Sequence, residues 1–349
     1  MKAVSSRALF RLSGIAVLLV SLVGGWYWIA LRTYAESPVL NEEAVVLEVA
    51  PGTSAVALAE RLADAEVIDQ PQRFLWLLRW RGQERALQAG EYEIPPHIRI
   101  EQLIDILVRG RVRLHSLTVV EGWTFEQLRR ALAEHPAIQS TLEGVGRKEI
   151  MARLGRPGRD PEGWFLPDTY LFPRGTRDEE FLARALAAME RVLEREWAGR
   201  EDGLPLQDPY EALILASIVE KETAVPEERA RIAGVFIRRL QKGMRLQTDP
   251  TVIYGLGEEF DGDLRKRHLR DRGNPYNTYR HHGLPPTPIA LPGRDSIHAV
   301  LHPAEDDSLY FVAKGDGSHH FSATVEEHNA AVRRYQLRRR DDYRSRPQP

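Results

Sequence analysis

A charge-free run near the N-terminus constrains this chain more than any other feature. Residues 12–31 contain no charged side chain, whereas Lys2, Arg7 and Arg11 precede them. At about 1.5 Å of rise per residue, a helix of this length would cross the ~30 Å hydrocarbon core of a bilayer. The run therefore predicts a transmembrane anchor at residues 12–31. The basic residues before it place residues 1–11 on the cytoplasmic side by the positive-inside rule.

A cleaved signal peptide is the alternative interpretation of this run. Trp26, Tyr27 and Trp28 stand at its far end, where amphipathic rings favour the membrane interface. The run is long for a signal peptide, and no small-x-small cleavage site follows it. We therefore expect an uncleaved anchor, a linker at residues 32–44 and an extracytoplasmic body after it.

Composition excludes several classes of function. The 349 residues carry a formal net charge of −2, so nucleic-acid binding has no electrostatic footprint. The chain has no cysteine, which excludes disulfides, thiolate metal sites and cysteine nucleophiles. His281, His282, His319, His320 and His328 do not form the i,i+4 zincin pattern with a glutamate between them, so we expect no metal site there.

An approximate repeat covers the first half of the chain. Residues 47–53 lead into an apolar-periodic run, and residues 117–124 lead into a second one seventy positions later. Each copy is typical of a short strand, a glycine turn and an amphipathic helix. A second strand-like segment, at residues 92–95 and 170–173, then precedes another helical pattern in each copy. We interpret each copy as a β-α-…-β-α unit.

The second copy is longer than the first, which predicts an insertion between Pro136 and Pro161. The alternative is that βα elements with glycine turns resemble one another by chance.

A buried helix is predicted at residues 211–223, because its apolar residues 212–216, 218 and 219 cover every face. Glu220 lies at its polar end, in helical register with Leu213 and Ala216. A carboxyl group beside an apolar wall loses hydration, which favours the protonated form that can donate to a leaving group. Glu220 is therefore the candidate catalytic acid/base. The ordinary alternative is a solvated helix end.

Two polar segments supply candidate substrate-binding side chains. Residues 247–251 are first of all typical of a turn, and residues 274–279 of an aromatic-rich structural loop. Their mixed donors, acceptors and rings would also suit sugar hydroxyls and stacking. The candidates are Gln247, Asp249, Tyr254, Tyr276 and Asn277.

Several segments in this order are recognisable as motifs. They are EGWT at residues 121–124, EGWFLPDTY at 162–170, ASIVEKET at 216–223, QTDPTVIYG at 247–255, YNTY at 276–279, GLPPTPI at 283–289, HFS at 320–322 and EHN at 327–329. They resemble the YceG-like family of endolytic murein transglycosylases. The resemblance extends from the anchor to about Tyr335, and the family's catalytic glutamate corresponds to Glu220.

The resemblance implies an α+β protein anchored by a single helix in the inner membrane, with its C-terminal body in the periplasm. A LysM-like βααβ module at residues 45–112 would bind glycan that contains N-acetylglucosamine. A mixed α/β YceG-like catalytic domain would occupy residues 113–338. Residues 339–349 lie outside the family pattern, and we expect them to form a disordered tail.

The implied reaction cleaves the bond between N-acetylmuramic acid (MurNAc) and N-acetylglucosamine (GlcNAc) within peptidoglycan strands, leaving 1,6-anhydromuramyl ends. It would terminate or trim nascent strands and needs one glutamate and no cofactor. Peptidoglycan strands are the expected partner, and peptidoglycan synthases are a further candidate. Two alternatives stay open: a non-catalytic peptidoglycan-binding scaffold, and a muramidase-type hydrolase with Asp249 or Glu222 as second carboxylate.

Overall fold

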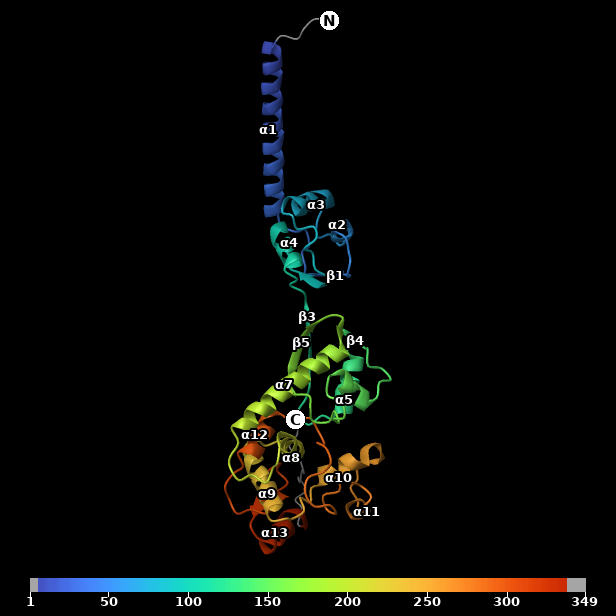
Figure 1. Ribbon diagram of the computed structural model, residues 1–349, viewed down its shortest axis with the longest axis vertical. Helices are drawn as coiled ribbons and strands as arrows, with labels where there is room; N and C mark the ends of the chain where they lie inside the picture. The colour runs from blue at the N-terminus through green and yellow to red at the C-terminus, as the bar shows by residue number, and fades with distance from the viewer. Residues whose placement is uncertain (1–5, 338–349) are drawn as a thin grey trace. The chain divides into compact units, whose positions relative to one another are not determined.

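The chain divides into two compact units. The computed structural model describes residues 6–337 (Figure 1). The first unit comprises residues 1–115 and 171–174, and the second comprises residues 116–170 and 175–349. The breaks fall within β3 (Leu114–Thr118) and β5 (Thr169–Pro173), which pair with each other. The predicted module ends at residue 112, close to the first break. Residues 1–5 and the predicted tail at 339–349 lie outside the described residues.

A single long helix, α1 (Ser6–Glu36), begins the described chain. From Ser13 to Glu36 its length and apolar composition are sufficient to cross a membrane. Residues 32–36 were predicted as part of a linker, but they continue this helix. The reason is that Leu31, Tyr34 and Ala35 are buried in the core of the first unit.

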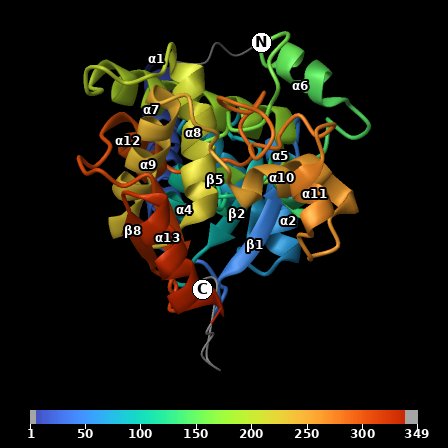
Figure 2. The ribbon, with the colours of Figure 1, turned by 90° about the horizontal axis from the view of Figure 1, so that it is seen from below.

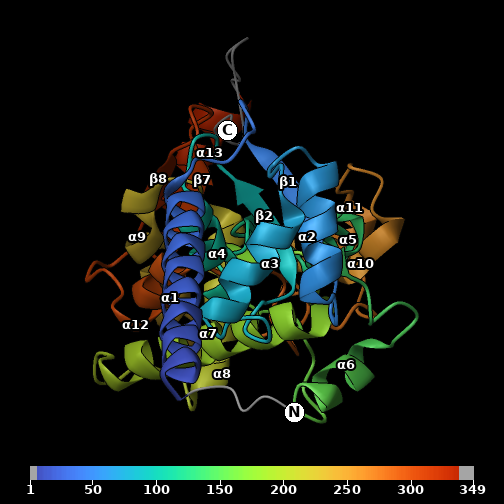
Figure 3. The ribbon, with the colours of Figure 1, turned by 90° about the horizontal axis from the view of Figure 1, so that it is seen from above.

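The first unit contains the predicted β-α-α-β order, followed by one more helix. Strands β1 (Val45–Val49) and β2 (Gly90–Ile94) are antiparallel, with Val45 opposite Ile94. Between them lie α2 (Ala55–Asp64) and α3 (Pro71–Trp80), and α4 (Ile100–Val108) follows β2. Figure 3 shows α3 beside α1. The core draws on every one of these elements, with fully buried Leu58, Leu62, Phe74, Leu78, Tyr92, Leu103 and Leu107.

The second unit begins with the second copy of the repeat. After β3 come α5 (Phe125–Glu134), α6 (Arg147–Arg153), β5 and α7 (Asp178–Ala198). The order β-α-α-β-α is the same as in the first copy, where it runs from β1 to α4. Two short strands are additional, β4 (Ile138–Gln139) and β6 (Thr176–Arg177), and they pair in parallel. Strand β4 and helix α6 lie within the predicted insertion.

The rest of the second unit is mainly helical. Its elements are α8 (Pro209–Glu222), η1 (Pro226–Glu228), α9 (Arg229–Gln241), α10 (Asp249–Leu256), η2 (Gly257–Glu259), α11 (Lys266–Arg270), α12 (Arg294–Leu301), β7 (Tyr310–Ala313), β8 (His319–Ser322), α13 (Val325–Val332) and a π-helical turn, η3 (Arg333–Leu337). Strands β7 and β8 form an antiparallel pair.

Helix α8 is the buried helix that the sequence predicts. The Asp208 carboxylate accepts the Glu211 N–H at 2.9 Å, and Pro209 occupies the first turn. Residues 212–219 are all buried, because α8 lies among α7, α9 and α12 (Figure 2). Helix α12 was not predicted, and it contributes a contact to the site described next.

Candidate functional site

Glu220 occupies the last turn of α8, where the buried part of the helix ends. Its side chain is 6% exposed. The next residue, Lys221, donates from Nζ to the backbone carbonyl of Gly122 at 3.1 Å. The buried helix therefore delivers one carboxyl group to a polar boundary, beside the turn that contains Gly122.

One hydrogen bond and one ion pair from other elements hold the Glu220 carboxyl group. The backbone N–H of Gly293 donates to Oε2 at 2.9 Å, and Nη2 of Arg229 lies 3.8 Å from Oε1. Gly293 is the N-cap of α12, so the N–H also belongs to the positive end of a helix dipole. Arg229 is the first residue of α9. The side chain is thus held by three helices that meet at this point.

Glu121 is a second carboxylate at this site, and sequence reasoning missed it. Its Oε2 lies 3.4 Å from Nη2 of Arg229, the same atom that approaches Glu220. Asp295 contacts the other terminal nitrogen of Arg229 at 3.2 Å. Burial raises the pKa of Glu121, as do the charges of Glu220 and Asp295, while Arg229 lowers it.

Gly293 leaves the space that Glu121 occupies. A Cβ atom built at Gly293 would lie 1.9 Å from Oε1 of Glu121. The turn that carries Glu121 is pinned to the segment before α12. The Gly122 N–H donates to the Leu291 carbonyl at 2.9 Å, and the Leu291 N–H donates to the Trp123 carbonyl at 2.6 Å. The EGW motif at residues 121–123 therefore has a structural role beside Glu220.

Gln247 and Asp249 lie next to the end of α8. The link between them is Thr248, the N-cap of α10, whose hydroxyl donates to the Glu222 carboxylate. Gln247 has a φ of 53°, in the left-handed region that disfavours side chains. Asp249 accepts a 2.7 Å hydrogen bond from the Tyr279 hydroxyl. A turn was predicted at residues 247–251, whereas Asp249 and Pro250 begin a helix.

Tyr254 and Tyr276 contact each other around a different carboxylate, Glu162. Their ring centroids are 4.9 Å apart in an edge-on arrangement. The Tyr254 hydroxyl donates to Oε2 of Glu162 at 2.9 Å. The Tyr276 hydroxyl shares a 2.8 Å hydrogen bond with Thr287. Both rings are partly buried, and both hydroxyls already have protein partners.

Glu162 is the most deeply buried carboxylate in this region. Its side chain is 1% exposed, and it accepts the Phe125 N–H at 2.8 Å. Arg147 lies 3.5 Å away. Burial raises the pKa of Glu162 to about 7, although the hydrogen bonds from Phe125 and Tyr254 and the charge of Arg147 act against it. The signal in the sequence was the EGWFLPDTY motif, which carries this glutamate next to a tryptophan.

Asn277 does not fit the substrate-binding role predicted for it. The residue is fully buried. Its Nδ2 donates to the carbonyls of His268, Leu269 and Asp271 at 3.1, 3.3 and 2.6 Å. Its Oδ1 accepts the Tyr279 N–H at 3.0 Å. The side chain therefore ties α11 to the following loop, and its burial keeps it from contact with a sugar.

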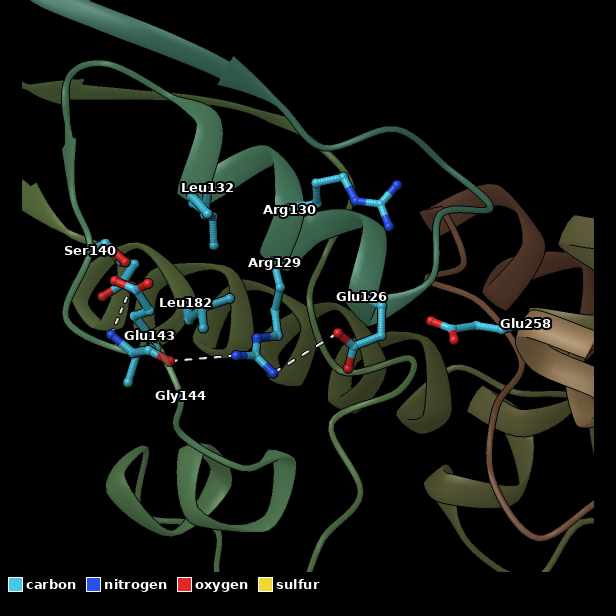
Figure 4. A pocket seen from close by; sticks show the side chains of 12 residues that line it. Glu126, Arg129, Arg130, Leu132, Ser140, Glu143, Gly144, Leu182 and Glu258 are labelled. Carbon is cyan, nitrogen blue, oxygen red and sulfur yellow. Dashed lines mark hydrogen bonds and ion pairs between the residues drawn. The ribbon is translucent and has the colours of Figure 1, made fainter.

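Two hollows in the second unit do not include Glu220. One, of about 530 Å³, is lined by residues of α5 and α7 together with Glu258 and carries both signs of charge (Figure 4). Figure 4 shows Glu126 and Glu258 facing each other across it. The other hollow, of about 550 Å³, is lined in part by Trp164 and Tyr210, whose rings stack at 5.7 Å. Glu220 lines neither of them.

The sequence of this chain matches a known protein family. The model of the YceG-like family matches residues 47–334. The chain belongs to the YceG-like family. An endolytic murein transglycosylase of Bacillus subtilis (strain 168) is 30% identical over 319 residues, which cover 84% of this chain and 86% of that protein.

Two further relatives are more distant. An endolytic murein transglycosylase of Streptococcus pneumoniae serotype 2 (strain D39 / NCTC 7466) is 25% identical, and the match covers 93% of this chain but 64% of that protein. The chain thus spans less than two thirds of that relative. A crystal structure of a yceG-like protein from Listeria monocytogenes aligns with a TM-score of 0.51 and 28% identity, covering 83% of this chain and 99% of that one.

The match to the YceG-like family begins in β1 and ends within η3, so it includes Glu220, Glu121 and Glu162. It leaves out α1 up to Glu36.

One group of side chains in this YceG-like protein has the composition of a metal site. Glu196 of α7 and His298 and His302 of α12 place ligand atoms within 4.8 Å of one another. None of these three residues was identified as a metal ligand from the sequence alone. Glu196 is also paired with Arg294 at 3.2 Å, a cation that competes with any metal. Glu220 is not a member of this group, and we assign the group no part in the reaction.

Proposed function

We propose that this chain is a lytic transglycosylase that cleaves the bond between MurNAc and GlcNAc within peptidoglycan strands, with Glu220 as its acid/base. The observation that carries the proposal is the Glu220 carboxyl group at the end of a buried helix, held by the Gly293 N–H and faced by Arg229. The curated relatives described above are named endolytic murein transglycosylases, which supports the same reaction class.

The proposed reaction needs one carboxyl group and no water. Protonated Glu220 donates its proton to the glycosidic oxygen as the bond from that oxygen to muramyl C1 breaks. The resulting carboxylate takes the proton of the muramyl C6 hydroxyl as O6 bonds to C1. The products are a 1,6-anhydromuramyl end and a new GlcNAc end. Gly293 and Arg229 are placed to stabilise the carboxylate between the two proton transfers.

The substrate groove is a proposal with four side chains. Gln247 and Asp249 are exposed beside the end of α8, where they are available to sugar hydroxyls. Tyr254 of α10 and Tyr276 of the loop after α11 would present ring edges farther along the groove. Asn277 is no longer in this set. The hollow lined by Trp164 and Tyr210 is a further place where a sugar ring could stack.

We also propose that α1 anchors the enzyme, with the body in the periplasm. Leu31, Tyr34 and Ala35 are core residues of the first unit, so the apolar helix continues without a break into folded structure. A cleaved signal peptide would be absent from the mature protein, so it could not contribute residues to the core of that protein. The β1-α2-α3-β2 order supports a LysM-like module that binds GlcNAc-containing glycan, and peptidoglycan synthases remain candidate partners.

The test is digestion of peptidoglycan strands in heavy-oxygen water, with the products examined by mass spectrometry. A lytic reaction incorporates no label and yields anhydromuropeptides. Label at a new reducing end would show hydrolysis and overturn the proposal. A Glu220→Gln variant that still supports the cellular function would favour the non-catalytic scaffold.

A two-carboxylate hydrolase is the second candidate, and one observation favours it. Glu121 approaches the same Arg229 nitrogen as Glu220, so two carboxyl groups do stand at the site. Glu222 and Asp249 are the second carboxylates expected from the sequence, and both have other hydrogen-bond partners. Glu222 accepts from Thr248, and Asp249 accepts from Tyr279. The heavy-oxygen experiment separates the two reactions.

A further inference from the structure

The junction between α1 and the first unit is rigid. Leu31, Tyr34 and Ala35 are 4–6% exposed, and the Tyr34 hydroxyl donates to the Gln70 carbonyl at 3.4 Å. Immediately after the helix, the Ser37 carbonyl accepts the Ile100 N–H at 3.0 Å. The first unit is therefore fixed on the end of α1 and cannot swing freely on a linker.

Helix α3 lies alongside the apolar part of α1. The ring of Trp76 is 5.8 Å from the ring of Tyr27. Tyr27 precedes Leu31 by four residues, which corresponds to about 6 Å along a helix axis. Trp76 therefore reaches back to a level within the charge-free run of residues 12–31, before the first charge at Arg32.

The outward face of α3 has the composition of an interfacial helix. Phe74, Leu75, Leu77 and Leu78 face the core, while Gln72, Arg73, Trp76, Arg79 and Trp80 are exposed. Trp76 is 42% and Trp80 61% exposed, so both large rings would contact water in a soluble protein. Tryptophan and arginine on one helix face are typical of the boundary between lipid and water.

Single exposed aromatic residues are common and need no explanation. Here Trp76 and Trp80 lie one helical turn apart on the same face, and Trp76 contacts α1 itself. Trp26 and Trp28 of α1 are 70% and 48% exposed at neighbouring levels of that helix. Trp26, Trp28 and Trp76 therefore lie near one end of the apolar run, and Trp80 lies one helical turn from Trp76.

We propose that α3 lies in the outer interface of the phospholipid bilayer, with Trp76 and Trp80 inserted among the headgroups and Arg73 near lipid phosphates. The proposal rests on α1 being a membrane anchor. If residues 12–31 of α1 span the hydrocarbon core, the contact of Trp76 with α1 restricts α3 to the depth of the outer headgroup region. The first unit would then be seated on the membrane surface, and its glycan-binding elements held at a fixed height above it.

The test uses full-length protein in vesicles of phosphatidylethanolamine and phosphatidylglycerol. The natural chain has no cysteine, so single cysteines can be labelled with a fluorophore without background. Gln72→Cys reports the outward face of α3, and Ser21→Cys reports the middle of α1. Glu48→Cys, on the exposed side of β1, is the matched control in the same unit.

We expect a nitroxide attached near the lipid headgroup to quench the Gln72→Cys label at least twofold more than the Glu48→Cys label. Iodide in the water phase should quench them in the opposite order. Ser21→Cys should respond to a nitroxide deep in the acyl chain. If Ser21→Cys responds and Gln72→Cys does not, the seating of α3 is wrong while the anchor stands, and a protein partner becomes the occupant of this face. If Ser21→Cys fails to respond, the anchor itself is wrong.

Discussion

The backbone N–H of Gly293 donates a 2.9 Å hydrogen bond to Oε2 of Glu220. The two residues lie 73 positions apart, on helices α12 and α8. This contact holds the carboxyl group in one orientation through a backbone donor.

Replacing Glu220 by glutamine should remove the activity and keep the fold. The glutamine oxygen can still accept the Gly293 N–H, but the side chain can neither donate nor accept the catalytic proton. We expect kcat to fall by about 10²–10⁴-fold, measured as anhydromuropeptide release by mass spectrometry, with an unchanged melting temperature. Glu227→Gln, an exposed glutamate of η1, is the control and should retain full activity. Comparable activity in the two variants would exclude Glu220 as the acid/base.

Glu121→Gln should move the pH–activity profile. The pKa of Glu121 is raised by burial and by the charge of Glu220, so this carboxyl group titrates above its usual range. When ionised, its negative charge favours retention of a proton at the site. Without that charge, activity should be lost at a lower pH, by about 0.5–1 in pH. Initial rates between pH 4 and 9 measure the change.

The matched control for this experiment is Glu134→Gln, an exposed glutamate at the end of α5. Its profile should superimpose on that of the natural enzyme. A Glu121→Gln profile that also superimposes would show that Glu121 has no electrostatic influence on the reaction. A complete loss of activity at every pH would instead favour the two-carboxylate hydrolase.

Gly293→Ala should disturb the site through Glu121. The added methyl group would lie 1.9 Å from Oε1 of Glu121, whose side chain must then move. The backbone is compatible with alanine, since Gly293 has a φ of −74°. We expect kcat/KM to fall between about 10-fold and 100-fold because the geometry around Glu220 changes. Gly146→Ala, at the open N-cap of α6, is the control.

A double variant identifies the cause of that loss. In a Glu121→Ala background the space beside Gly293 is empty, so Gly293→Ala should have little additional effect. Additive losses would mean that the alanine acts on the Gly293 N–H and not on Glu121.

The features of this site that the sequence predicts are those that depend on residues close together in the chain. The apolar residues 212–216, 218 and 219 cover every face, and this pattern alone predicts a buried helix with Glu220 at its end. Glu121 was missed because nothing near it in sequence signals its role. Its contacts with Arg229 and Gly293 join segments more than 100 residues apart, and only the packing of α8, α9 and α12 brings them together.

Other errors have equally specific causes. Asp249-Pro250 is compatible with both a turn and the first turn of a helix, and the structure forms the helix. An asparagine in a polar loop suits either a sugar or the backbone, and burial decides between the two for Asn277. Residues 32–36 were assigned to a linker because the charge of Arg32 ended the apolar run. The helix continues because the residues after it have a core to bury in.

Glu162→Gln should reduce the dependence of stability on pH. The pKa of Glu162 is about 7 in the folded protein, against 4.5 as its ordinary value, so the folded state binds the proton more tightly. The stability linked to this proton is fully present below pH 4.5 and is lost as the pH rises through 7. The loss amounts to on the order of 3 kcal/mol. Melting temperatures of full-length protein in detergent at pH 5 and pH 8 should differ less in the variant.

The control for the pH experiment is Glu149→Gln, whose side chain is 60% exposed on α6. It should show the same difference between pH 5 and pH 8 as the natural protein. If Glu162→Gln does too, then Glu162 ionises at its ordinary pH in the folded state.

Asn277→Ala should destabilise the protein without a specific loss of catalysis. Removing the amide leaves three backbone carbonyls and the Tyr279 N–H without their partner in a buried loop. We expect the free energy of unfolding to fall by about 2–4 kcal/mol, with kcat/KM per folded molecule unchanged. Asn329→Ala, at an exposed position of α13, should alter neither quantity. A variant of Asn277 with natural stability and weakened substrate binding would return this side chain to the groove, because only contact with the glycan would then explain the loss.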